Sequence, residues 1–196
     1  MRALVVCLYL SMSVVVAQQA TQSSNVRQWP QSWLNGGSAN WNHADMKIPA
    51  VPASQDTYPA TCRSSLRPPT TPEDRRLMQA GWMLFGPLQV YGRTSLITAA
   101  ASFDGMCRPM HHQAFVFHGG NFIGILSPKP MDSRFDGDLT HVSLPNAATI
   151  MAEYRRYAPS DPACCPSGTS SVVFSLRNDG GRPVLIPGKP STSSNE

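Results

Sequence analysis

From Trp82 onward, short apolar runs alternate with turn sequences, a pattern that predicts β-strands. The runs are 84–91, 94–101, 113–117, 122–126, 140–144, 151–157, 172–176 and 183–186. Gly119-Gly120 separates the third run from the fourth, and Gly180-Gly181 separates the last two. Adjacent glycines accept the positive φ angles of a tight turn, so each pair predicts a β-hairpin.

A short helix is predicted before the first strand. Thr71 can cap its start, Pro72 suits the first helical position, and the two acidic residues that follow favour the positive end of the helix dipole. Together these patterns predict a mainly β (α+β) domain over residues 72–189. We expect a single antiparallel sheet or a small barrel-like domain, with about six or seven strands and one or two short helices.

The first residues of the chain differ from this domain. Residues 1–17 are mostly apolar and end in Val15-Val16-Ala17, a pattern typical of a signal peptide that is cleaved after Ala17. The apolar run is shorter than the ~20 residues that span a bilayer, so we expect no transmembrane helix in the mature chain. Retention of this segment as an N-terminal anchor is the alternative.

The two segments that flank the domain are predicted to be disordered. Residues 18–71 are rich in Pro, Ser and Gln and contain few Val, Ile or Leu residues, so little core can offset the entropy of ordering them. Trp29, Trp33 and Trp41 lie in this linker and could dock on the domain or on a partner. Residues 190–196 form a polar tail.

Composition excludes several classes of protein. Hydrophobic residues make up 41% of the 196 residues and charged residues 14%. The chain is therefore too apolar to be fully disordered and too weakly charged for a coiled coil. Its formal charge of +4 is spread along the sequence without a basic run, so no nucleic-acid partner is expected.

Four cysteines follow the predicted signal peptide, namely Cys62, Cys107, Cys164 and Cys165. An even number in an exported chain predicts two disulfides, with three possible connectivities. Adjacent Cα atoms lie about 3.8 Å apart, below the usual disulfide span, so a bond between neighbours is disfavoured. We expect Cys164 and Cys165 to pair with the other two. The alternatives are one disulfide with two thiols, or a vicinal disulfide that acts as a redox switch.

Residues 132–138 form a dense polar loop. The spacing of its aspartates and Gly137 resembles a calcium-binding loop, but Arg134 and Ser143 occupy positions where that loop needs ligands. We expect a turn in which Arg134 pairs with a local carboxylate and aspartate side chains cap backbone amides. Neither a metal nor a cofactor is expected.

Catalytic motifs are absent from the sequence. It contains no HExxH, paired CxxC or GxSxG pattern, and we do not expect an enzyme. One alternative is a small hydrolase that uses His111, His112 or Asp132. Another is a metal- or redox-responsive protein that uses Cys164, Cys165 and histidines.

Several motifs, taken in order, resemble one bacterial family. They are Asp104-Gly105-Met106-Cys107-Arg108-Pro109, residues 115–120, residues 124–128, Tyr154-Arg155-Arg156-Tyr157, residues 161–167 and residues 172–174. Over residues 82–187 this order is similar to the LppP/LprE lipoprotein-like domain. The resemblance implies an exported bacterial envelope protein with a small, mostly β domain and no assigned catalytic residues. The chain departs from the lipoprotein members because it lacks a suitable lipid-accepting cysteine.

The sequence thus predicts a non-enzymatic, disulfide-stapled binding module that is periplasmic or secreted. Its partner would be an unknown envelope component or protein. The residues expected to face a ligand are His111, His118, Asp132, Arg134, Asp136, Tyr154 and Arg156.

Overall fold

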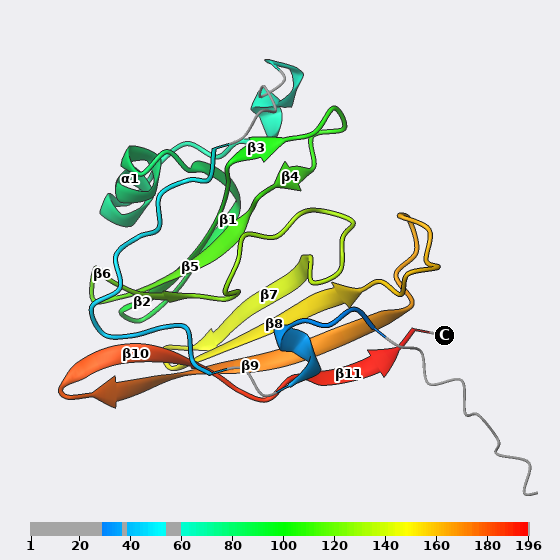
Figure 1. Ribbon diagram of the computed structural model, residues 1–196. Coiled ribbons are helices and arrows are strands. Elements are labelled where there is room, and N and C mark those ends of the chain that lie inside the picture. The colour runs from blue at the N-terminus through cyan, green and yellow to red at the C-terminus, as the bar shows by residue number, and fades with distance from the viewer. Residues whose placement is uncertain (1–28, 37–38, 54–59, 196) are drawn as a thin grey trace, which may run out of the picture.

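A computed structural model describes residues 29–36, 39–53 and 60–195 (Figure 1). The predicted signal peptide lies outside the described residues. The elements, in chain order, are η1 (Trp33–Asn35), η2 (Ala60–Ser65), α1 (Pro72–Gln79), β1 (Met83–Tyr91), β2 (Thr94–Ala100), β3 (Ser102–Phe103), β4 (Pro109–Met110), β5 (Gln113–His118), β6 (Asn121–Ile125), β7 (Leu139–Asn146), β8 (Thr149–Arg156), β9 (Gly168–Asp179), β10 (Arg182–Pro187) and β11 (Ser191–Ser194). Within the described ranges, no helix is long and apolar enough to cross a membrane.

The strands form three antiparallel sheets. One has the order β1-β2-β5-β6, a second has the order β10-β9-β8-β7 with β11 also paired to β9, and β3 pairs with β4 (Figure 1). Both predicted hairpins are confirmed as β5–β6 and β9–β10. The mainly β class is confirmed, but the single-sheet and barrel-like expectations are wrong, because among the described strands each sheet stays open. Pro128 and Pro130 follow β6 and cannot donate to a ladder, and the chain then crosses to the second sheet.

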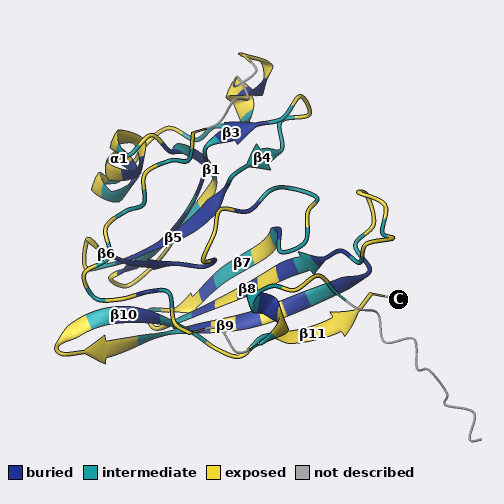
Figure 2. Cartoon of the chain, in the orientation of Figure 1, coloured by how far each residue is buried: buried dark blue, intermediate teal, exposed yellow. Residues whose placement is uncertain are grey.

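The main core lies between the two large sheets. Along β8, Ile150, Ala152 and Tyr154 are buried while Met151 and Glu153 are exposed. This alternation is that of a strand covered on one face, and Figure 2 shows it as bands along β8 and β9. The buried members of the core are Leu34, Leu96, Ala114, Val116, Ile123, Leu126, Met131, Leu144, Ile150, Ala152, Tyr154, Val172, Phe174 and Leu185.

A second core covers the other face of the β1-β2-β5-β6 sheet. Helix α1 contributes Leu77, and Met46, Ile48 and Val51 of the N-terminal segment pack against the same cluster. Residues 113–117 of β5 are all buried, because this strand lies between the two cores. The molecule is therefore layered as helix and N-terminal segment, first sheet, and second sheet (Figure 1).

The N-terminal segment is not an unstructured linker where the structure describes it. Leu34 is buried in the main core, and Trp41 Nε1 donates to the Ile125 carbonyl oxygen at 3.0 Å. The side-chain amide of Asn42 both donates to that carbonyl and accepts from the Ile125 N–H. Tryptophan side chains bury large apolar areas, and the Asn42 amide takes the hydrogen bonds that a neighbouring strand would make with Ile125. The segment can therefore dock on the domain without runs of Val or Leu.

The C-terminal tail is likewise ordered up to residue 195, contrary to the expectation from its composition. Ser191–Ser194 form β11, which pairs with Ser171–Gly168 of β9. All four β11 residues are exposed. Backbone hydrogen bonds, which need no apolar side chains, hold this edge strand in place.

The disulfide pairing expected from the sequence is wrong. Cys62 bonds to Cys107, with their Cα atoms 5.1 Å apart. Cys164 bonds to Cys165, with their Cα atoms 3.8 Å apart. The reason is topological: η2, which carries Cys62, lies beside β3, whereas the loop that follows β8 lies at another end of the molecule (Figure 1).

Candidate ligand-binding site

Two residues expected to face a ligand lie inside the protein instead. Tyr154 and Arg156 are fully buried on the inner face of β8. The Tyr154 hydroxyl donates to the Leu126 carbonyl oxygen at 2.6 Å, and burial raises the pKa of Tyr154 well above its ordinary value. This hydrogen bond therefore links β8 of the second sheet to the residue that follows β6 of the first sheet.

Arg156 is an internal anchor for the N-terminal segment. Its Nε donates to Asp136 Oδ1 at 2.9 Å and its Nη1 to Ser170 Oγ at 3.2 Å. Its Nη2 donates to Asn35 Oδ1 at 2.9 Å and to the Pro30 carbonyl oxygen at 3.3 Å. A buried guanidinium needs this many partners to offset its lost hydration.

The 132–138 loop is a turn whose aspartates cap backbone amides, as predicted. The bonds are His111 N to Asp132 Oδ1 (2.6 Å), Tyr157 N to Asp136 Oδ1 (2.9 Å) and Arg134 N to Asp138 Oδ2 (3.2 Å). The arginines that pair with the carboxylates are Arg155 with Asp138 and Arg156 with Asp136, not Arg134. Each aspartate thus accepts a hydrogen bond from a different backbone amide. The carboxylate oxygens of the loop do not converge as the ligands of a calcium ion would.

A histidine–aspartate pair that the sequence did not single out lies beside this loop. His112 and Asp138 are buried, and His112 Nε2 lies 3.0 Å from Asp138 Oδ1. Both residues line a cleft of about 470 Å³. Ser133 lines the same cleft, but its hydroxyl donates to the Pro109 carbonyl oxygen rather than to His112. No serine is therefore hydrogen-bonded to this histidine among the described residues.

His118 and His111 do not converge on this pair, whereas His141 lines the same cleft. His118 lies at the opposite end of β5 and its Nδ1 is 2.9 Å from Thr94 Oγ1. His111 is held against Asp132, with its Nδ1 3.7 Å from the carboxylate. In the part of the chain that the structure describes, no three His, Cys, Asp or Glu residues could hold a metal ion.

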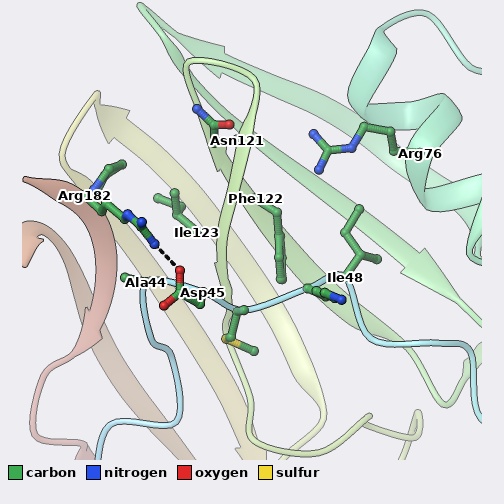
Figure 3. Close-up of a pocket in the computed structure, with 11 residues that line it drawn as sticks. Ala44, Asp45, Ile48, Arg76, Asn121, Phe122, Ile123 and Arg182 are labelled. Carbon is green, nitrogen blue, oxygen red and sulfur yellow. Dashed lines mark hydrogen bonds and ion pairs between the residues drawn. The ribbon is translucent and has the colours of Figure 1, made fainter.

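A pocket with a different chemistry opens where four distant segments meet (Figure 3). Its volume is about 520 Å³. The lining residues come from the N-terminal segment, α1, β6 and β10: Ala44, Asp45, Met46, Lys47, Ile48, Arg76, Asn121, Phe122, Ile123, Arg182 and Pro183. Both the docked segment and the β9–β10 hairpin are needed to form it.

Cations surround this pocket. Arg76, Lys47 and Arg182 line it together with a single carboxylate, Asp45, which forms an ion pair with Arg182. Figure 3 shows Arg76 and Arg182 on either side of Phe122 and Ile123. The residues that line the pocket thus carry an excess of positive charge.

Arg76 is held in place by uncharged groups. Its Nη1 donates to the Gly120 carbonyl oxygen at 2.6 Å, and its guanidinium carbon lies 5.5 Å from the centre of the Phe117 ring. A carbonyl and an aromatic face orient a guanidinium without cancelling its charge. Among the described residues, no carboxylate forms an ion pair with Arg76.

The pocket also has apolar walls. Phe122 and Ile123 are nearly buried in β6, and Ile48 and Met46 are half-buried beside them. Apolar walls with a few placed charges are the usual composition of a small-molecule site, and the volume lies within the usual range. The arrangement can hold an anion that carries a short hydrocarbon portion.

Sequence reasoning missed this pocket. Its cations lie 29 and 106 positions apart (Lys47, Arg76, Arg182), and none belongs to a local motif. Two of its walls come from a segment predicted to be unstructured and from a hairpin tip. The sequence patterns predicted the helix and the strands that line it, but not that they meet around one pocket.

A family model described as LppP/LprE lipoprotein matches residues 92–179, which confirms the resemblance predicted from the sequence. The match runs from the turn before β2 to the end of β9. Asn121, Phe122 and Ile123 lie within it, whereas Arg76 and Arg182 lie outside it. Neither a curated protein nor a solved structure matches the chain.

Proposed function

Because residues 92–179 carry the LppP/LprE lipoprotein family region, we propose that this chain is an exported bacterial envelope protein that binds an amphiphilic anion. The ligand would be a carboxylate or phosphate head on a short hydrocarbon chain, held in the pocket of Figure 3. The role is that of a non-enzymatic binding module. The observation that carries the proposal is Arg76, a cation that a carbonyl and a ring orient and that forms no ion pair among the described residues.

The charges and walls of the pocket support this ligand class. A head group next to Arg76 would gain charge-assisted hydrogen bonds, worth about 1.5–3 kcal/mol each in proteins. Lys47 lies on the same rim and adds attraction over a longer range. The hydrocarbon portion would lie along Phe122 and Ile48, where it would exclude water.

The test compares decanoate, decyl phosphate and uncharged decanol by isothermal titration calorimetry. The two anions are used below their critical micelle concentrations and decanol below its solubility limit. Binding of an anionic probe should exceed that of decanol and weaken as salt is added. In the Arg76→Gln variant the affinity for the anionic probes should fall at least about 10-fold. Decanoate and decyl phosphate distinguish a carboxylate head from a phosphate head.

The matched control is Arg63→Gln, which removes an exposed arginine from η2, outside the pocket. It leaves the pocket residues unchanged and should bind as the wild type does. Equal affinity in the wild type and Arg76→Gln, or no binding of either anionic probe, would overturn the proposal.

A further inference from the structure

We propose that the Cys164–Cys165 disulfide is a site of thiol–disulfide exchange with an external dithiol. The other disulfide, Cys62–Cys107, serves the fold. The two bridges differ in exposure, in what holds their surroundings, and in how much chain they constrain. Each difference favours thiol–disulfide exchange at Cys164–Cys165 over exchange at the other bridge. This inference does not depend on the pocket of Figure 3.

Exposure separates the two disulfides first. Cys164 and Cys165 are both exposed, on the loop between β8 and β9. Cys62 is completely buried in a small cluster with Phe103 and Ala100, and its partner Cys107 is half-buried against the same cluster. An external thiolate must reach a sulfur atom in line with the S–S bond, so access favours attack at the vicinal pair.

The loop that carries the vicinal pair is ordered by other bonds. Asp161 accepts hydrogen bonds from the Ala158 N–H (2.7 Å), the Ser167 N–H (2.9 Å) and the Ser167 hydroxyl (2.5 Å). The Tyr157 hydroxyl donates to the Ala163 carbonyl oxygen at 3.2 Å. These bonds join the two ends of the loop without the sulfur atoms, so the loop keeps its place when the disulfide opens.

The amount of chain closed by each bridge also differs. Cys62 and Cys107 are 45 positions apart, whereas Cys164 and Cys165 are neighbours. A disulfide stabilises a fold mainly by restricting the unfolded chain, and this effect grows with the length of the closed loop. A bond between neighbours restricts almost nothing, so stability does not account for the vicinal pair.

The exchange itself requires a dithiol as reductant. One external thiolate attacks the sulfur of Cys164 or Cys165, which forms a mixed disulfide and releases the other cysteine as a thiolate. The second external thiol then attacks the mixed disulfide. The external dithiol leaves as a disulfide, having given up two electrons, and its two protons end on the thiols of Cys164 and Cys165.

The test is graded reduction of the folded, oxidised full-length chain with dithiothreitol. Samples are quenched with N-ethylmaleimide at intervals, and peptide mass spectrometry locates the label. We expect Cys164 and Cys165 to be labelled at least about 10-fold faster than Cys62 and Cys107. Equal rates, earlier reduction of Cys62–Cys107, or label at Cys164 and Cys165 before any reductant is added would overturn the proposal.

A second measurement separates exchange from loss of structure. The Cys164→Ser/Cys165→Ser variant should keep the wild-type melting temperature within about 2 °C, since a bridge between neighbours adds little stability. It should also lose the fast labelling phase while Cys62–Cys107 stays intact. A large fall in melting temperature would show that the vicinal pair is structural, and would contradict the proposal.

Discussion

Arg156 shows how one buried charge can hold two distant parts of a chain together. Its guanidinium lies between Asp136 of the polar loop and residues 30–35 of the N-terminal segment. The Trp29 ring lies 5.5 Å from the guanidinium carbon and adds a cation–π contact. Sequence reasoning placed Arg156 on a ligand-facing surface, because the alternation along β8 does not say which face is covered.

Replacement of Arg156 by Met should destabilise the fold by about 3–5 kcal/mol. The reason is that Asp136 would lose its ion-pair partner in a largely covered position, and the N-terminal segment would lose its anchor. Urea denaturation followed by tryptophan fluorescence measures the change in unfolding free energy. Arg177→Met, at an exposed position on β9, is the control and should change stability by less than about 0.5 kcal/mol.

At the scale of elements, helix α1 follows its sequence signals closely. Thr71 Oγ1 accepts a hydrogen bond from the Asp74 N–H at 3.1 Å, and Asp74 Oδ2 accepts one from the Thr71 N–H at 3.1 Å. Asp74 also forms an ion pair with Arg67 at 2.7 Å. The helix start could be predicted because capping is a contact between residues three positions apart, whereas the pairing with Arg67 depends on how the preceding chain folds back.

The environment of Asp74 makes the stability of this helix start depend on pH. Burial opposes the charged form, but the Arg67 side chain and the Thr70 and Thr71 amides donate to the carboxylate and hold the pKa of Asp74 well below its ordinary value. A lowered pKa in the folded state stabilises the fold at pH values above the unfolded pKa of about 3.9. This contribution is lost as the pH falls from there toward the pKa of the folded state.

The Asp74→Asn variant isolates this contribution. At pH 7 it should be about 2 kcal/mol less stable than the wild type, because it loses the charge that Arg67 pairs with. As the pH is lowered from 5 to 2, the wild type should lose stability faster, so the difference should shrink. Urea titrations of both proteins at several pH values measure it. A difference that stays constant over this range would contradict the assigned role.

At the scale of the whole molecule, the layers depend on long-range contacts. Asn42 completes the edge of β6, and Cys62–Cys107 ties η2 to the chain between β3 and β4. The bridge closes a loop that spans α1 and the first three strands. It therefore restricts the segment that must pack on the outer face of the first sheet.

Removal of the Cys62–Cys107 disulfide by a double Ser substitution should cost about 2–5 kcal/mol of stability. The cause is the larger freedom that the unfolded chain gains when the long loop opens. Calorimetric melting under non-reducing conditions measures the effect. An unchanged melting temperature would mean that the packing around Ala100 and Phe103 fixes this end of the molecule without the disulfide.

The local features of this protein follow from its sequence: the strand runs, the two Gly-Gly hairpins, the capped helix and the family region. These features depend on side-chain alternation and on contacts a few residues apart, which a linear pattern records directly. Other features follow only from the packing of the folded chain: the division into separate sheets, the disulfide partners, the burial of Tyr154 and Arg156, and the pocket around Arg76. Each of these joins residues tens of positions apart, and their meeting depends on how the sheets stack and where the polar N-terminal segment docks.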